Sequence, residues 1–158
     1  MASEKNKSCI TQLLPFVDKL ATALNNSSRV DVVYFDFAKA FDSVNHDLIL
    51  YKLKHQFGID GILLQLIKDY LRDRMQKVSI NGSSSDTLKV HSGVPQGSVI
   101  GPLLFVLFID DINDCISEGT ELALYADDTK IWREVTCDTG QVELQNYFNR
   151  LSEWLPTK

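Results

Sequence analysis

Residues 122–134 read LALYADDTKIWRE and carry the clearest structural signal in the sequence. Two short apolar-rich runs, residues 122–126 and 129–134, are separated by the adjacent acids Asp127 and Asp128. Runs of this composition are typical of strands, and aspartate is favoured in turns because its side chain bonds to nearby backbone. The stretch therefore predicts an antiparallel hairpin that carries two carboxylates at its turn.

A second strand is predicted at residues 30–37, VDVVYFDF, which are rich in β-branched and aromatic residues. We expect this strand to be mostly buried. Residues 77–80 and 87–90 flank Asn81-Gly82 and a run of serines, which predicts a hairpin with a longer loop. Strands that pair with neighbours in the chain favour an antiparallel α+β fold over a doubly wound one.

Apolar residues at helical spacing predict four amphipathic helices, at residues 9–24, 46–57, 61–72 and 142–154. The apolar stretch 99–109 is predicted to form a further helix that is buried. This stretch is too short to cross a bilayer, which requires about 20 residues. Because the first residues lack the apolar core of a signal peptide, we expect a soluble intracellular protein of the nucleus or cytoplasm, with no membrane partner.

The composition is that of a globular domain: 158 residues, of which 44% are apolar and 23% charged. Three cysteines at 9, 115 and 137 show no metal-ligand spacing, so free thiols in a reducing compartment are expected. The net charge is −5. Proteins that hold nucleic acid use Lys and Arg to neutralise phosphates, so the composition opposes nucleic-acid binding by this chain alone.

Three acids lie where a charge is costly unless it is paired or bound to a cation. Asp36 ends an apolar strand, and Asp127 and Asp128 lie between two others. Carboxylates close together raise each other's pKa, and a divalent cation removes that penalty. Oxygen ligands suit Mg²⁺ or Mn²⁺, and acids that converge from two strands are typical of a two-metal site for phosphoryl chemistry.

Other polar residues receive structural interpretations. Asp42 is interpreted as an acid of a helix start or turn, and the pair Asp110-Asp111 as the solvent-facing end of the apolar helix. The three histidines, at 46, 55 and 91, share no metal-like spacing, which favours solvated or capping roles.

Three segments carry a specific resemblance. Residues 35–44 (FDFAKAFDSV), 92–104 (SGVPQGSVIGPLL) and 125–128 (YADD) resemble motifs A, B and C of reverse transcriptases, in the same order and at similar separations. Residues 8–14 (SCITQLL) and 46–53 (HDLILYKL) are similar to the non-LTR, LINE-like retrotransposon branch. The resemblance implies a polymerase palm-type antiparallel sheet packed with helices. Residues 1–158 would form a partial domain, with the end of the fingers and motifs A, B and C, and with most of the fingers and thumb outside.

The resemblance also implies a role for each matching position. Asp36 and Asp127 would bind both metal ions, Mg²⁺ or Mn²⁺, Asp128 would complete the acidic cluster, and the Phe37 carbonyl would also contact a metal. Phe41 would lie under the sugar of the incoming nucleotide and exclude a ribose. The remaining positions would line the nucleotide and template pocket: Pro95, Gln96 and Gly97. The implied activity is RNA-directed DNA polymerisation, with an RNA template, a DNA primer and deoxynucleoside triphosphates as partners.

Three alternatives remain open at this point. The chain could be a catalytically inactive retrotransposon remnant or interaction module. An aspartate-nucleophile phosphatase would fit Asp36 and the later acids loosely, but it requires an acid at the position of Ala38 and alternating βα units. An RNA-dependent RNA polymerase shares the palm, although an aromatic residue at Phe41 favours deoxynucleotides. Because the basic fingers residues of the family would lie outside residues 1–158, we expect negligible polymerase activity from this chain alone.

Overall fold

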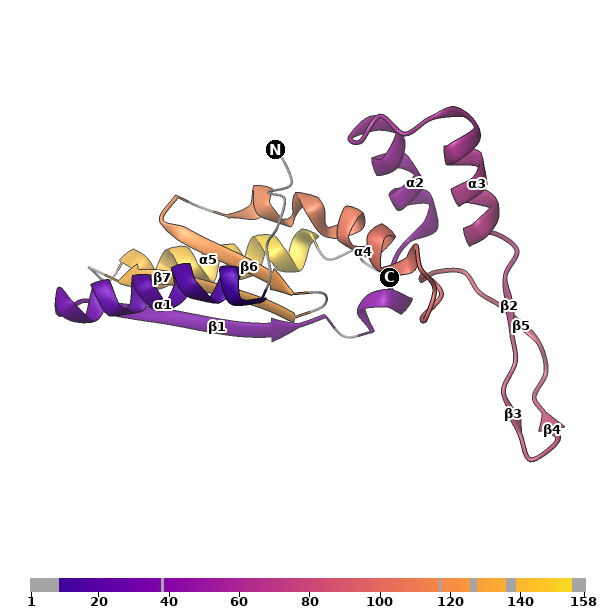
Figure 1. Ribbon diagram of the computed structural model, residues 1–158, viewed down its shortest axis with the longest axis horizontal. Helices are drawn as coiled ribbons and strands as arrows, with labels where there is room; N and C mark the ends of the chain where they lie inside the picture. Colours follow the sequence, from indigo (N-terminus) through magenta and orange to yellow (C-terminus); the bar gives the residue numbers. More distant parts are fainter. Residues whose placement is uncertain (1–8, 38, 117, 126–127, 136–138, 155–158) are drawn as a thin grey trace. The chain divides into compact units, whose positions relative to one another are not determined.

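The computed structural model describes residues 9–37, 39–116, 118–125, 128–135 and 139–154. They fall into two compact units, each described here by itself. The sheet unit comprises the chain up to residue 37 together with residues 112–157, and the helical unit comprises residues 38–111. Figure 1 labels their elements.

The sheet unit contains three antiparallel strands in the order β1-β7-β6. They are β1 (Arg29–Asp36), β6 (Thr120–Tyr125) and β7 (Asp128–Val135). The hairpin predicted from residues 122–134 is confirmed as β6 and β7. The later strand of this hairpin, β7, takes the central position and pairs with β1 along its whole length.

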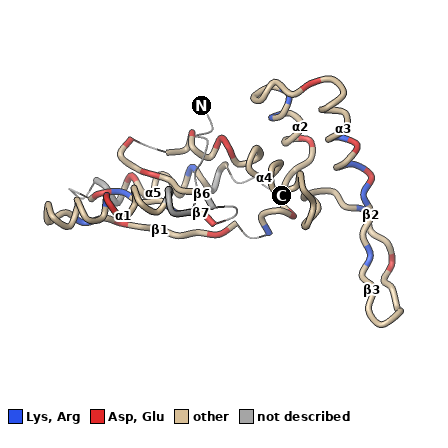
Figure 2. The backbone as a smooth tube through the Cα atoms, in the orientation of Figure 1, with Lys and Arg blue, Asp and Glu red and all other residues tan. Residues whose placement is uncertain are grey.

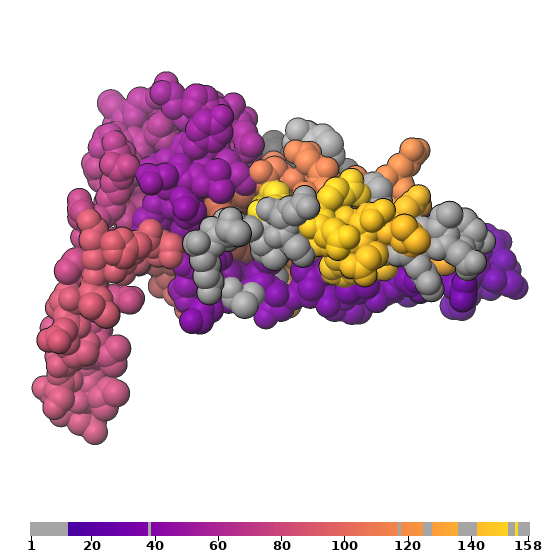
Figure 3. Space-filling model, turned by 180° about the vertical axis from the view of Figure 1, so that it is seen from behind, coloured from indigo at the N-terminus to yellow at the C-terminus, as the bar shows by residue number. Residues whose placement is uncertain are grey.

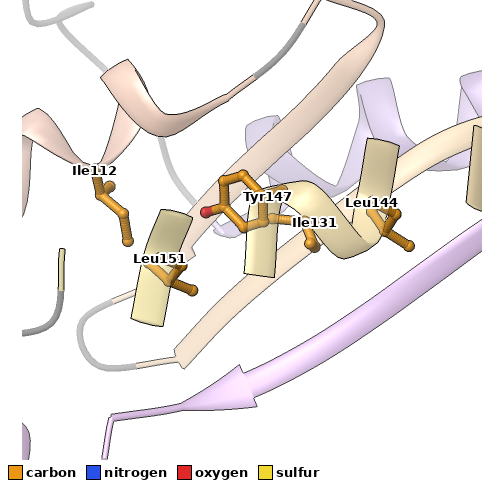
Figure 4. Packing of buried hydrophobic residues seen from close by; sticks show 5 residues of the cluster. All are labelled: Ile112, Ile131, Leu144, Tyr147 and Leu151. Carbon is orange, nitrogen blue, oxygen red and sulfur yellow. The ribbon is translucent and has the colours of Figure 1, made fainter. Parts of the chain in front are cut away.

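Helices cover both faces of β7. Ile131 and Trp132 are neighbours on this strand, so their side chains point to opposite faces, and both are buried. On one face Ile131 packs under α5 (Thr139–Trp154) in a core with Ile112, Leu144, Tyr147 and Leu151 (Figure 4). On the other face the Trp132 ring lies 5.0 Å from the Phe16 ring of α1 (Cys9–Asn25). Figure 3 shows the outer surface of the sheet unit that α5, in yellow, forms.

A strand forms where residues 30–37 predicted one, but the prediction that this strand is mostly buried was wrong. The strand exists as β1, but none of its residues is fully buried, and Tyr34 is 70% exposed. The reason is position: β1 is an edge strand, and its apolar residues are covered only in part by α1 and α5. Strand composition is similar at the edge and at the centre of a sheet, so sequence pattern alone does not separate the two.

The helical unit contains α2 (His46–His55), α3 (Gly61–Leu71) and α4 (Gly101–Ile109), with a short 3₁₀ turn at Ala40–Asp42. A second 3₁₀ turn, Asp110–Cys115, follows α4. The Asn45 side chain accepts hydrogen bonds from the backbone N–H groups of the next turn, and Asp60 accepts one from Gly61, so both helices begin at side-chain caps. The predicted helices 46–57 and 61–72 are confirmed.

The apolar stretch 99–109 forms a helix that is shorter and less buried than predicted. Helix α4 begins at Gly101, whose backbone N–H donates to the Ser98 hydroxyl at 3.0 Å, and Val99 is 94% exposed. Within the helix, Leu103 and Val106 are half exposed, whereas the residues facing the rest of the unit are buried: Leu104, Phe105, Phe108 and Ile109. Only one face of the helix therefore meets a partner among the described residues.

The hairpin predicted around residues 77–90 forms an arm of the helical unit, but its turn is short. The pair β2 (Met75–Gln76) and β5 (Leu88–Lys89) is followed by β3 (Ser79–Ile80) and β4 (Ser83–Ser84). Asn81 and Gly82 alone connect β3 to β4, with φ of 49° and 82°, as a type I′ turn requires. The longer loop was a wrong prediction, because two of the serines extend the strands. Figure 3 shows this arm clear of the helices of its own unit.

None of the described helices is long and apolar enough to cross a membrane.

Candidate active site

Two of the three predicted catalytic acids lie opposite each other at one end of the sheet. Asp36 is the last residue of β1, Asp128 is the first residue of β7, and the two are register partners. Tyr125, at the end of β6, is the other partner of Asp128. Residues directly opposite each other in an antiparallel pair project to the same face, so both carboxylates point the same way. Both residues are exposed. The third acid, Asp127, lies outside the described residues.

This pairing is unfavourable in the absence of a cation. Like charges directly opposite each other in an antiparallel sheet are destabilising, whereas favourable pairs contribute roughly 0.2–1 kcal/mol. A divalent ion removes the repulsion, and two solvent-accessible carboxylates are the oxygen donors that Mg²⁺ and Mn²⁺ prefer. Among the described residues there is no group of three or more His, Cys, Asp or Glu that could hold a metal. Asp36 and Asp128 therefore fit part of a metal site whose third predicted ligand is Asp127.

A lysine follows on the same face of the sheet. Lys130 is two residues beyond Asp128 on β7 and is the register partner of Tyr34. Its ammonium lies 3.5 Å from the centre of the Phe16 ring and 5.2 Å from that of Trp132. Burial lowers the pKa of Lys130, because the charged form loses water there. A cation held on aromatic rings thus lies on the same face of β7 as Asp128, two residues further along the strand, a feature that the sequence pattern did not indicate.

Phe37 follows Asp36 directly and anchors this end of β1. Its ring centre lies 5.8 Å from that of Phe35 and 6.4 Å from that of Trp154 at the end of α5. The side chain packs against the core of the sheet unit. The predicted role of Phe37 depends on its backbone carbonyl, which leaves the ring available for this packing.

The other predicted site residues lie in the helical unit. Phe41 belongs to the 3₁₀ turn Ala40–Asp42, is partly exposed, and stacks at 4.8 Å on the buried ring of Phe105 in α4. A side chain that contacts a bound sugar must be supported on one side and exposed on the other, and the Phe41 ring has both properties. The predicted position under the nucleotide is compatible with this geometry and remains a prediction.

The loop of residues 92–97 is attached to the chain around Phe41 by backbone bonds. The Val94 N–H donates to the Phe41 carbonyl at 2.8 Å, and the Gly93 N–H donates to the Val44 carbonyl at 2.8 Å. The Ser92 hydroxyl donates to the Asp42 carbonyl at 2.9 Å. The structure thus brings the ends of two predicted motifs together within the helical unit.

Within this loop, Gln96 and Gly97 are exposed and Pro95 is half-buried. The Gln96 amide lies 3.4 Å from the Asp42 carboxylate. Gly97 has φ of 77°, a conformation that glycine adopts without strain. Asp42 therefore receives a structural role beside the loop, in agreement with its interpretation as a turn residue.

One histidine was interpreted wrongly. His46 is 9% exposed, and its Nε2 lies 2.8 Å from the Gly93 carbonyl, which also accepts from Arg74 Nη1 at 3.0 Å. The prediction of a solvated or capping role therefore fails for His46. The signal was absent from the sequence because the contact joins residues 47 positions apart.

The acidic pair after α4 also differs from expectation. Asp111 accepts from Lys52 at 2.7 Å, and the same ammonium donates to the Phe108 carbonyl at 2.6 Å. The Lys52 side chain is 5% exposed. Asp111 is thus paired with a buried lysine. Its role is structural, but its carboxylate does not simply face solvent, contrary to the prediction from the sequence.

Comparison with known proteins identifies the family and the fold of the chain. Residues 1–157 match the family model described as "Reverse transcriptase (RNA-dependent DNA polymerase)". Among similar proteins, the RNA-directed DNA polymerase from mobile element jockey of Drosophila funebris is 34% identical over 150 residues, which cover 90% of this chain and 16% of the relative. The probable RNA-directed DNA polymerase from transposon BS of Drosophila melanogaster is 31% identical over 156 residues, covering 93% of this chain and 17% of the relative.

A solved structure of apo telomerase from Candida tropicalis, truncated from the C-terminal domain, superposes with a TM-score of 0.64. It is 15% identical, and the match covers 90% of this chain and 31% of that one. This likeness confirms the predicted α+β, palm-type fold. The family match and the relatives confirm the predicted resemblance to reverse transcriptases of non-LTR retrotransposons. The chain therefore belongs to the reverse transcriptase family of RNA-dependent DNA polymerases.

Proposed function

We propose that this chain is the catalytic palm portion of an RNA-directed DNA polymerase. The enzyme would add deoxynucleotides to the 3′-hydroxyl of a DNA primer on an RNA template. The observation that carries the proposal is the register pairing of Asp36 with Asp128 at the exposed end of the sheet. In this reaction the 3′-oxygen forms a bond to the α-phosphorus of the incoming triphosphate, and the bond to pyrophosphate breaks.

The chain's own residues would orient the reactants. Asp36, Asp127 and Asp128 would hold Mg²⁺ or Mn²⁺, which would activate the 3′-hydroxyl and stabilise the in-line displacement. Gln96 and Gly97 would lie along the nucleotide, with Pro95 stiffening the turn. Phe41 would exclude a ribose 2′-hydroxyl by bulk. Positioning of this kind supplies much of the rate in phosphoryl transfer.

The proposal extends to the whole protein only in part. The chain spans about a sixth of the length of the relatives it matches, 16% and 17% for the two described above. We therefore propose, from family membership, that template, primer and nucleotide are shared with other parts of a longer polymerase. Assignment of residues 1–158 to the end of the fingers and to motifs A, B and C belongs to the same proposal, as does a nuclear or cytoplasmic location.

The test compares three variants in a full-length enzyme that carries this domain. Asp36→Asn and Asp128→Asn should abolish primer extension on an RNA template with Mg²⁺, whereas Asp86→Asn, on the exposed arm, should retain it. In the 158-residue chain, Mg²⁺ should raise the unfolding midpoint of the unmodified protein and of Asp86→Asn, because an ion that binds only the folded state stabilises it. The midpoint of Asp36→Asn should not respond.

Two results would contradict the proposal. Primer extension that persists in Asp36→Asn would remove this residue from the metal site. A full-length enzyme that fails to extend any primer, together with a chain whose stability ignores Mg²⁺ and Mn²⁺, would instead support a catalytically inactive remnant.

A further inference from the structure

The Gly93 carbonyl accepts two side-chain hydrogen bonds. His46 Nε2, from the first residue of α2, lies at 2.8 Å, and Arg74 Nη1 donates at 3.0 Å. His46 and Gly93 are both buried, and Arg74 is half-buried. Two donors from separate segments thus converge on one oxygen, and a carbonyl has two lone pairs with which to accept both.

The same peptide group makes a third bond on its other side. The Gly93 carbonyl and the Val94 N–H belong to one planar peptide unit, and this N–H donates to the Phe41 carbonyl at 2.8 Å. Rotation of the plane would therefore break the bonds at both of its ends. Whatever holds the Gly93 carbonyl also aims the Val94 N–H at Phe41.

The backbone is pressed closely together at this point. Gly93 has φ of 87°, and a Cβ built on it would lie 2.7 Å from the Asp42 Cα and 2.9 Å from the Asp42 carbonyl oxygen. Only glycine fits there. The loop that leads to Gln96 and the turn that carries Phe41 are consequently in direct backbone contact at Gly93. Of the bonds between them, the one from the Val94 N–H is the bond that ends on Phe41 itself, so the orientation of this peptide plane bears directly on where Phe41 lies.

We propose that His46 and Arg74 are positioning residues that lock the Gly93–Val94 peptide and thereby set the geometry of Phe41 against the loop 92–97. This inference rests on the proposed function, in which Phe41 and Gln96 face the incoming nucleotide. Neither residue touches the nucleotide. Their effect is on discrimination between deoxyribose and ribose and on the KM for the nucleotide, because a rotated plane leaves Phe41 free to shift away from the sugar.

The chemistry of the two side chains determines which substitutions are informative. The Gly93 carbonyl oxygen can only accept, so His46 must carry its hydrogen on Nε2, in the neutral or the protonated ring. Gln offers an amide N–H of similar reach, whereas Phe fills the space without a donor. Arg74→Lys retains a donor, and Arg74→Met does not. Arg72→Met is the matched control, since Arg72 is exposed and pairs with Asp47 at 3.3 Å.

The first experiment measures incorporation of deoxynucleotides and ribonucleotides by the full-length enzyme. His46→Phe and Arg74→Met should each raise the deoxynucleotide KM and reduce sugar discrimination by about threefold to tenfold, the effect of one lost hydrogen bond. The value of kcat should fall less than discrimination. His46→Gln and Arg74→Lys should recover most of the loss, and Arg72→Met should match the unmodified enzyme. The double variant His46→Phe/Arg74→Met should lose more than the product of the single effects, because each donor compensates for the other.

The second experiment measures hydrogen exchange at the Gly93–Val94 peptide and does not depend on activity. In the 158-residue chain, the Val94 amide should exchange its hydrogen faster in Arg74→Met than in Arg72→Met, with equal unfolding midpoints. Because Arg74 is half-buried, this variant carries the test even if His46→Phe fails to fold. If the full-length enzyme proves inactive, the proposed function fails, while the exchange of Val94 still decides whether the plane is locked.

The proposal is overturned by unchanged Val94 exchange in Arg74→Met. It is also overturned if an active enzyme loses kcat with sugar discrimination intact, or if Gln at position 46 performs no better than Phe.

Discussion

Asp36 and Asp128 owe their proximity to strand register and not to their separation of 92 positions in the chain. Asp36 ends β1 and Asp128 begins β7, so the two carboxylates lie at the exposed end of the sheet, while apolar residues further along the strands pack against α1 and α5. Two antiparallel strands, one ending where the other begins, are enough to bring this carboxylate pair together. The repulsion between the acids is the local feature that a bound cation relieves.

Replacement of Phe41 tests its predicted contact with the sugar. In the full-length enzyme, Phe41→Ala should admit ribonucleotides, lowering discrimination by roughly 10–100-fold with little loss of deoxynucleotide use, because a steric clash is removed. Stability should fall as well, since Phe41 stacks on Phe105 at 4.8 Å. The measurement is the ratio of kcat/KM values for the two sugars. Phe105→Leu is the control: if it shifts the ratio equally, packing and not the sugar contact explains the effect.

Tyr147 predicts a dependence of stability on alkaline pH. Burial raises the pKa of its hydroxyl to about 12, with a smaller contribution from Cys115. The folded pKa exceeds the usual value of about 10, so this contribution to stability is complete below pH 10 and is lost as the pH rises toward 12. The free energy of unfolding should fall between pH 10 and 12 more steeply, by up to about 1.4 kcal/mol per pH unit, than in Tyr147→Phe.

The same variant reports on the core at neutral pH. The Tyr147 hydroxyl is buried with no hydrogen-bond partner among the described residues. Removal of an unsatisfied buried hydroxyl should leave stability unchanged or raise it by about 1 kcal/mol. A loss of more than that in urea denaturation of Tyr147→Phe would indicate that the hydroxyl is bonded in solution.

At the scale of elements, α2 and α4 are joined by one buried lysine. Lys52 of α2 donates to the carbonyl of Phe108 in the last turn of α4 and to Asp111 beyond it. A cation at a helix C-terminus is favourable because the last carbonyls carry partial negative charge. The contact fixes the end of α4, the helix that follows the loop 92–97.

Lys52→Met should therefore destabilise the helical unit by about 2–4 kcal/mol, since it removes one partner of a largely buried ion pair. Lys54→Met is the matched control on the same helix, because Lys54 is exposed, and it should change stability by less than about 0.5 kcal/mol. Urea denaturation of the 158-residue chain measures both. Equal midpoints for the two variants would show that the Lys52 contacts do not hold the elements together.

At the scale of the whole molecule, the balance of charges bears on nucleic-acid binding. Acids outnumber Lys and Arg by 21 to 16. The two signs are mixed along the backbone in both units, and the arm carries basic residues that include Lys77 and Lys89 (Figure 2). Lys89 is paired with Asp73 at 3.0 Å, so part of this positive charge is already offset. Strong retention of a duplex by phosphate contacts is not expected from such a surface.

The 158-residue chain by itself should therefore bind a primer–template no more tightly than the roughly 1–100 µM typical of non-specific binding, and should show negligible primer extension. Fluorescence anisotropy at two salt concentrations measures the affinity, and extension assays with Mg²⁺ and then Mn²⁺ measure the activity. Nanomolar binding, or extension that Asp36→Asn abolishes, would contradict this prediction.

The sequence alone determined the type of nearly every element. Alternating or helical spacing of apolar residues depends on local geometry, so the segments 122–134 and 46–72 predicted their strands and helices within a few residues. The order of three motifs indicated the family before any fold was known. Asp36 could be named as a candidate metal ligand because a charge at the end of an apolar strand requires a partner.

Only the tertiary structure decided which strand is central and which side chains meet across the chain. The exposure of β1 and the exposed face of α4 depend on neighbours that spacing does not specify. The contact of His46 with Gly93 joins residues 47 positions apart. The spacing of apolar residues indicates which face of one element is buried. Register and long-range hydrogen bonds, in contrast, are set by the packing of all elements at once. That packing aligns Asp36 with Asp128.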